Sequence, residues 1–272
     1  MKIIILVVCI ISLQKAYSQE LFVVTEPASN MPNQSIGLRA MNSFMMEKNG
    51  KLNYHIMPEI MWGASAKLML HFQTYFSNRS TGGLYAEGGS LYAKIRLLST
   101  DDIHAHFRLA VYGRYSTNRA DIHQDEIETM GHNTGYESGL IATGLKNKVA
   151  ISTSISIEKA LDNTPQNKFP SIQSNRATNY TLSIGKLMYP KRYTSIKQTN
   201  INLMVECLGQ TLAGNGKSYV DIVPAIQFII RSQARIDFAY RKELYSNMRR
   251  TAANGFLLKL EYNLFNVRKK GK

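Results

Sequence analysis

Residues 149–158 read Val-Ala-Ile-Ser-Thr-Ser-Ile-Ser-Ile-Glu, with Val, Ile or Thr at every odd position and Ala, Ser or Glu at every even position. A period of two puts the odd side chains on one face of an extended strand and the even ones on the other. The same kind of alternation recurs at residues 234–241 and 256–264. These stretches predict strands whose two faces meet different surroundings.

Twelve such runs follow one another along the chain, most of them about ten to thirteen residues long. Strands of soluble domains usually contain about 5–6 residues, whereas a tilted strand that crosses a bilayer needs about 9–11. The sequence therefore predicts an all-β fold, a transmembrane antiparallel up-and-down β-barrel of about 12 strands. The runs lie at about residues 35–45, 53–63, 67–77, 83–98, 105–115, 136–146, 148–159, 178–188, 199–208, 218–230, 234–244 and 255–265.

Alternation alone does not say which face points outward. A soluble barrel buries its apolar face, whereas an outer-membrane barrel turns that face to lipid and its polar face to the lumen. The connections decide between them, because the two longest, 116–135 and 160–177, fall on the same side of the barrel and three on the other side contain about three residues or fewer. Segregated loops are typical of outer-membrane barrels. The residues then predicted to line the lumen are Arg39, Glu59, Lys67, His71, Lys94, Arg96, Arg108, Arg114, Glu206, Asp221, Lys259 and Glu261.

Aromatic residues near the ends of the runs support this orientation, because rings of amphipathic character concentrate at the two membrane interfaces. They are Trp62, Tyr75, Phe76, Tyr115, Tyr189, Tyr245, Tyr262 and Phe265. Pairing across the short turns can also be predicted. Opposing Trp62 to Leu68, or Ile230 to Ala234, keeps both faces of the paired strands chemically consistent.

The first 18 residues have the form of a secretory signal peptide, with Lys2, an apolar stretch over residues 3–13 and small residues at Ala16 and Ser18. The remaining chain divides into a periplasmic N-terminal segment (19–34), the barrel (35–266) and a basic C-terminal tail (267–272). Two cysteines in 272 residues exclude a disulfide scaffold. A net charge of +14 is compatible with nucleic-acid binding, but export from the cytoplasm argues against that partner. Anionic lipid and lipopolysaccharide are the favoured partners, and the basic residues predicted to contact them on the outer loops are Arg176, Lys217, Arg249 and Arg250.

The signal, the twelve runs, the loop asymmetry and the last run resemble single-chain outer-membrane β-barrel proteins of Gram-negative bacteria. Residues 25–32 (Thr-Glu-Pro-Ala-Ser-Asn-Met-Pro) and 98–102 (Leu-Ser-Thr-Asp-Asp) are similar to uncharacterised porin-like members of that class. The resemblance implies insertion by the barrel-assembly machinery, which would recognise the last run, and it brings no catalytic motif with it.

Two polar groups are candidate metal sites. The longest loop carries Asp121, His123, Asp125, Glu126, Glu128 and His132, and carboxylates with imidazoles can hold a divalent cation. No spacing fixes such a site, so we interpret it as an acidic outer loop that folds toward the pore mouth. Met57, Met61, Met69, Glu59 and His71 would form a lumen patch able to bind Cu(I), although methionines also simply fill space. We predict no metal and no cofactor.

The predicted function is a narrow porin-like channel for small polar or anionic solutes, since twelve strands lie between filled eight-stranded barrels and wide channels of 16–18 strands. Two alternatives stay open. The first is a structural or adhesive barrel that does not conduct. The second is a lipid-modifying enzyme, because outer-membrane phospholipase also has twelve strands, but His104 and His106 have no serine motif beside them.

Overall fold

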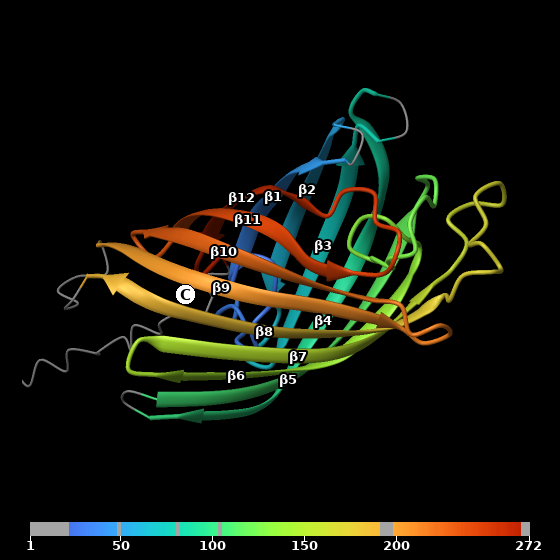
Figure 1. Ribbon diagram of the computed structural model, residues 1–272. Coiled ribbons are helices and arrows are strands. Elements are labelled where there is room, and N and C mark those ends of the chain that lie inside the picture. The colour runs from blue at the N-terminus through green and yellow to red at the C-terminus, as the bar shows by residue number, and fades with distance from the viewer. Residues whose placement is uncertain (1–21, 48–49, 80–81, 103–104, 191–197, 268–272) are drawn as a thin grey trace, which may run out of the picture.

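The computed structural model describes residues 22–47, 50–79, 82–102, 105–190 and 198–267, and they form one closed antiparallel barrel in which each strand pairs with its sequence neighbours and β1 pairs with β12 (Figure 1). The predicted barrel of twelve strands is therefore confirmed. The strands are β1 Ile36–Met46, β2 Leu52–Gly63, β3 Leu68–Ser77, β4 Tyr85–Asp101, β5 Ala105–Asn118, β6 Gly135–Lys146, β7 Val149–Ala160, β8 Arg176–Tyr189, β9 Thr199–Leu212, β10 Ser218–Ile230, β11 Ala234–Ser246 and β12 Asn254–Leu264. In the described part of the chain, no helix is long and apolar enough to cross a membrane.

The apolar faces of the strands point outward. On β7, Ile151, Ile155 and Ile157 are 48%, 54% and 63% exposed, whereas Ser156 and Glu158, on the other face of the strand, are only 4% and 3% exposed. A protein that buried its apolar surface from water would show the opposite arrangement. The outward apolar band is the one expected of a barrel surrounded by lipid.

The connections on the two ends differ as the sequence predicts. After β5 and β7 they run over residues 119–134 and 161–175, and the yellow-green loop 161–175 extends well beyond the strands in Figure 1. The opposite end has tight turns. Asn147 and Lys148 have φ of 48° and 73°, the left-handed pair that a two-residue hairpin turn requires. Arg231 and Ser232 have φ of 52° and 57° and lie within the turn that the hydrogen bond from Gln233 N to Ile230 O closes.

Register is reproduced across one turn and shifted across the other. Ile230 opposes Ala234 as predicted. Trp62 opposes Leu70 instead of Leu68, because Ser65 N bonds to Leu68 O and closes a longer turn. The shift is an even number of residues, so no side chain changes face.

Strand-end aromatics face outward at Trp62, Tyr115, Tyr189, Tyr245 and Tyr262. Tyr75 does not, because it is completely buried and its hydroxyl donates to Thr129 O inside the barrel. The prediction that Tyr75 belongs to an interfacial girdle is therefore wrong.

The N-terminal segment departs most from expectation. Its described part, residues 22–34, called here the N-terminal strap, lies within the ring of strands rather than beside the barrel in the periplasm; it is the blue chain inside the barrel in Figure 1. Phe22, Val23 and Ala28 are at most 2% exposed. The predicted signal peptide, residues 1–18, and residues 268–272 of the predicted tail lie outside the described residues.

Candidate solute pathway through the barrel

Ten of the twelve residues predicted to line the lumen are largely or completely buried, whereas apolar residues next to them on the same strands are exposed. The ten are Arg39, Glu59, His71, Lys94, Arg108, Arg114, Glu206, Asp221, Lys259 and Glu261. Lys67 is exposed in the turn between β2 and β3, and Arg96 is half-buried beside an irregularity in β4. Lys67 was predicted to begin a strand, but the longer turn described above includes it.

Arg39 of β1 organises one charge network in the lumen. Its Nη1 lies 2.5 Å from Glu26 of the strap and 3.0 Å from Glu59, and its Nε lies 2.9 Å from Glu261. Glu59 also contacts His71 Nδ1 at 2.6 Å. Burial alone would raise the pKa of Glu26, but Arg39 and Lys94 hold that pKa well below its usual range. The strap carboxyl is therefore an anion bound among wall residues.

Charged wall residues hold the backbone of the strap. Glu206 of β9 accepts hydrogen bonds from Val23 N at 2.7 Å, Val24 N at 3.1 Å and Thr25 N at 2.8 Å. Lys259 Nζ donates to Phe22 O and Val23 O at 2.7 and 2.6 Å. Irregular backbone at membrane depth is tolerated where protein groups satisfy its hydrogen bonds. These charge-assisted bonds explain why the strap lies inside the lumen.

The other end of the strap is held in the same way. Lys94 Nζ donates to Pro27 O at 2.6 Å and to Ser29 O at 2.9 Å. Ala28 N donates to Thr143 Oγ1 at 2.9 Å. Because β4 and β6 supply these contacts and β9 and β12 supply the previous ones, the strap crosses the lumen.

Residues 119–134, called here the inserted loop, enter the lumen from the opposite end. Thr129 N donates to Glu158 Oε1 at 2.5 Å, and Ile127 N donates to Gln210 Oε1 at 2.9 Å. Arg250 Nε donates to Glu126 at 2.7 Å and its Nη1 to Asp221 at 2.7 Å. The expectation that this loop folds toward the pore is met, and Arg250 is buried there instead of meeting lipopolysaccharide.

The loop residues proposed as a metal cluster do not converge. Asp121 and His123 are exposed and 3.7 Å apart, whereas Asp125 contacts Lys217 at 2.7 Å. Glu128 lies 3.4 Å from His132. No group of three or more His, Cys, Asp or Glu side chains within the described ranges is arranged to hold a metal ion.

Two glutamates of the inserted loop, Glu126 and Glu128, have pKa values shifted in opposite directions. Burial together with the charge of Glu126 raises the pKa of Glu128 to about 7. Burial would also raise the pKa of Glu126, but Arg250 and Arg241 hold it below its usual value. Burial and Arg79 keep the pKa of His132 well below its ordinary value.

The predicted methionine patch does point inward, since Met57, Met61 and Met69 are 5%, 1% and 2% exposed. Met69 Sδ accepts a hydrogen bond from Met31 N at 3.3 Å. The patch therefore packs against the strap. Of the two histidines weighed for an enzyme, His104 lies outside the described residues and His106 Nδ1 lies 4.0 Å from Asp101.

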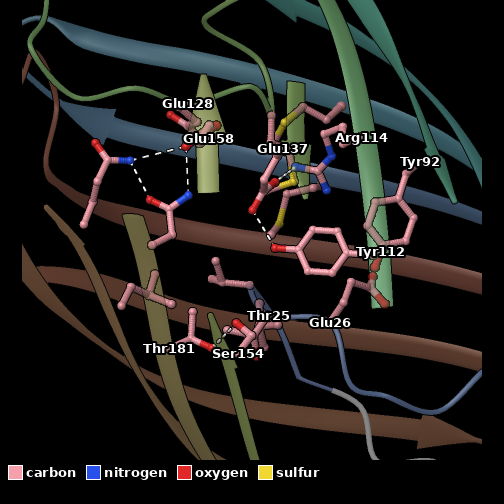
Figure 2. Close-up of a pocket in the computed structure, with 18 of the residues that line it drawn as sticks. Thr25, Glu26, Tyr92, Tyr112, Arg114, Glu128, Glu137, Ser154, Glu158 and Thr181 are labelled. Carbon is pink, nitrogen blue, oxygen red and sulfur yellow. Dashed lines mark hydrogen bonds and ion pairs between the residues drawn. The ribbon is translucent and has the colours of Figure 1, made fainter. Parts of the chain in front are cut away.

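Between the strap and the inserted loop remains a cavity of ≈ 190 Å³, called here the lumen chamber, to which all twelve strands contribute residues. Figure 2 shows Glu128 and Glu158 on one side of it and the rings of Tyr92 and Tyr112 on the other. Its ionisable lining comprises six carboxyl groups against four Lys or Arg side chains. The lining therefore does not favour the anionic solutes that the sequence suggested.

Several of these residues were missed at the sequence level. They are Glu26, Tyr92, Tyr112, Glu137 and Tyr219, together with Tyr75 and Arg250, which were assigned to an interfacial girdle and to lipopolysaccharide. Tyr92 and Tyr112 stand two positions from Lys94 and Arg114, so strand parity could have found them. Glu26 and Arg250 lie outside the strands, where parity gives no signal.

Comparison with solved structures identifies the architecture. The COG4313 outer membrane channel from Pseudomonas putida F1 matches with a TM-score of 0.56 and 13% identity, over 89% of this chain and 99% of that one. The chain has the fold of an outer-membrane β-barrel. This barrel also matches the β domain of the Bordetella autotransporter BrkA, with a TM-score of 0.49 and 10% identity over 85% of this chain and 99% of that one. No family model matches the chain, and no curated protein matches it by sequence.

Proposed function

We propose that this barrel is a narrow, internally gated channel of the outer membrane that passes small polar solutes. The observation that carries the proposal is the lumen itself: polar and charged side chains from all twelve strands surround a chamber that two inserted segments leave open. In eight-stranded barrels the side chains of the wall fill the interior, whereas here a chamber of ≈ 190 Å³ remains between the inserted segments.

The charge of the lining refines the expected solute. Arg39, Arg241 and Arg114 each lie close to at least one carboxylate, at 2.5, 2.6 and 3.5 Å. Pairing removes most of the attraction that an anion would feel. The carboxylate excess supports neutral or cationic solutes, in place of the anionic solutes that the sequence suggested.

A non-conducting structural barrel is the second candidate, because the strap and the inserted loop together fill much of the lumen. Planar-bilayer recording separates the two. We expect small conductance steps from the purified folded protein and, in a KCl gradient, a reversal potential showing preference for K⁺. If neither the wild type nor Glu206→Gln, in which the strap is loosened, shows conductance steps, the channel proposal is wrong and the barrel is structural.

The partners follow from the same proposal. The outward apolar band would contact outer-membrane lipid, exposed Arg176 on β8 and Arg249 near the loop ends would meet lipopolysaccharide phosphates, and the barrel-assembly machinery would insert the chain after export. Binding of vesicles with and without lipopolysaccharide, compared for wild type and Arg249→Gln, tests the lipopolysaccharide contact.

A further inference from the structure

Two carboxylates of the lumen chamber have no strong cationic partner. Glu158 of β7 accepts from Thr129 N at 2.5 Å, from Asn179 Nδ2 at 2.8 Å and from Gln210 Nε2 at 3.4 Å, all of them neutral donors. None of the ion pairs found among the described residues joins Glu158 or Glu128 to a Lys or an Arg. Glu128 lies 3.4 Å from His132, and Arg241, Arg79 and Arg250 act on it without forming an ion pair. Both line the chamber. Once ionised, these two groups carry negative charge that the protein does not fully compensate; because the pKa of Glu128 is about 7, its charge develops as the pH rises above neutral.

Buried polar atoms without partners face the same space. Tyr92 is 4% exposed, lines the chamber, and its hydroxyl has no hydrogen-bond partner in the described part of the chain. His71 is 3% exposed, also lines the chamber, and its Nε2 is likewise unpartnered there. Buried polar groups in native proteins are normally satisfied. Unmet groups at a cavity wall, independent of the carboxylates, indicate a ligand that supplies the missing bonds.

Aromatic rings complete the arrangement. The rings of Tyr92 and Tyr112 are 5.3 Å apart between centroids, and Arg114 Cζ lies 5.3 Å from the Tyr92 centroid. Tyr219 also lines the chamber, but Arg250 Cζ already lies 3.8 Å from its ring centroid, so the open ring is that of Tyr112. Tyrosine rings present a negative face that attracts cations, amines included. Carboxylates on one side and tyrosine rings on the other suit a positively charged organic group better than a sugar or an anion.

We propose that the lumen chamber is a binding site for a small organic cation, an amine whose charge is balanced by Glu158 and Glu128 and whose N–H group is accepted by the Tyr92 hydroxyl. At ≈ 190 Å³ the space lies below the range of about 300–1,000 Å³ typical of pockets for drug-sized ligands, so the cation is small. The inference deepens the proposed channel function and rests on it, because the bound amine would be a solute held during passage.

The test is calorimetric titration of the purified, full-length mature protein in detergent with methylammonium chloride and tetramethylammonium chloride, with sodium acetate as the anionic control. We expect both cations to bind and acetate not to bind. Glu158→Gln should weaken both cations at least tenfold. Glu87→Gln is the matched control, because Glu87 is a buried lumen carboxylate bonded to Ser77 that does not line the chamber, and it should leave both affinities unchanged.

A second variant tests the hydroxyl separately from the ring. Tyr92→Phe should weaken methylammonium, which has N–H groups to donate, and leave tetramethylammonium, which has none, unchanged. The proposal is overturned if the wild type binds neither cation at millimolar concentration, if Glu87→Gln and Glu158→Gln weaken binding equally, or if Tyr92→Phe affects both cations alike. Should Glu158→Gln fail to fold, Glu128→Gln in the inserted loop takes its place.

The two proposals fail in different ways. Conductance steps without cation binding would overturn the amine site and keep the channel. Cation binding without any conductance would keep the site and remove the role in passage. Saturating methylammonium should also reduce single-channel K⁺ current in the wild type and not in Glu158→Gln, if both proposals hold.

Discussion

The strap depends most on Glu206, which accepts hydrogen bonds from three consecutive backbone N–H groups and is itself fully buried. Glu206→Gln removes the charge and turns one of the two side-chain acceptors into a donor that faces the same N–H groups. Leaving a buried donor unsatisfied costs about 1–3 kcal/mol. With two of the three contacts weakened, the closed position of the strap should lose about 3 kcal/mol, on the order of a hundredfold in population.

Hydrogen exchange read by mass spectrometry measures this loss directly. Amides of residues 23–25 should exchange on the order of a hundredfold faster in Glu206→Gln than in the wild type, while amides of β9 keep their protection. Single-channel conductance should rise in parallel. Glu87→Gln serves as the control, since Glu87 is a buried lumen carboxylate that makes no contact with the strap among the described residues. Unchanged protection at residues 23–25 in Glu206→Gln would refute the view that this carboxylate anchors the strap.

Three further predictions follow from named contacts. Arg250→Met removes one of the two guanidinium groups, those of Arg250 and Arg241, that pair with the buried carboxylates of Glu126 and Asp221. It should lower stability by less than the about 3–5 kcal/mol expected for an uncompensated buried charge, read as a lower temperature of heat-dependent gel shift; an unchanged temperature would contradict the pairing. The pKa of Glu128 is raised to about 7, above the unfolded value, so its contribution to stability is fully present below pH 4.5 and is lost as pH rises through 7. Glu128→Gln should flatten the pH dependence of unfolding in that window, and a curve identical to wild type would argue against a raised pKa of Glu128. Ile155→Lys puts a charge on the outer face of β7 and should lower the free energy of unfolding by about 2–4 kcal/mol at mid-depth of the bilayer, measured by urea unfolding from lipid vesicles. Ser154→Lys, at the adjacent inward position, should lower it much less. Equal losses would contradict the assignment of the two faces.

The wall of the barrel could be predicted from the sequence because its determinants are local. In residues 149–158 the odd or even position of each side chain predicts the face of the strand on which it lies. The short turn at Arg231 and Ser232 allowed the register of β10 and β11 to be predicted correctly. The turn after β2 was predicted too short, since the hydrogen bond that closes it joins Ser65 to Leu68. That error displaced Trp62 by two positions without moving it to the other face.

The contents of the lumen could not be predicted in the same way. Val23 meets Glu206 across 183 positions of sequence, and Glu126 meets Arg250 across 124. No sequence periodicity relates such pairs. The sequence of a polar segment outside the strands also does not reveal whether that segment lies in the periplasm or crosses the lumen. The strand residues Lys94 and Lys259 were correctly placed inside, but their partners, the carbonyl groups of residues 22–29, carry no side-chain signal.

Whether lipid contacts the outward face can be measured with the protein's own fluorescence, because Trp62 is the single tryptophan and is 45% exposed at the end of β2. In vesicles, the account predicts that Trp62 emission is strongly quenched by lipids brominated on their acyl chains and resists quenching by iodide in the buffer. Emission that is indifferent to brominated lipid and quenched by iodide would contradict a barrel whose apolar face lies in the membrane.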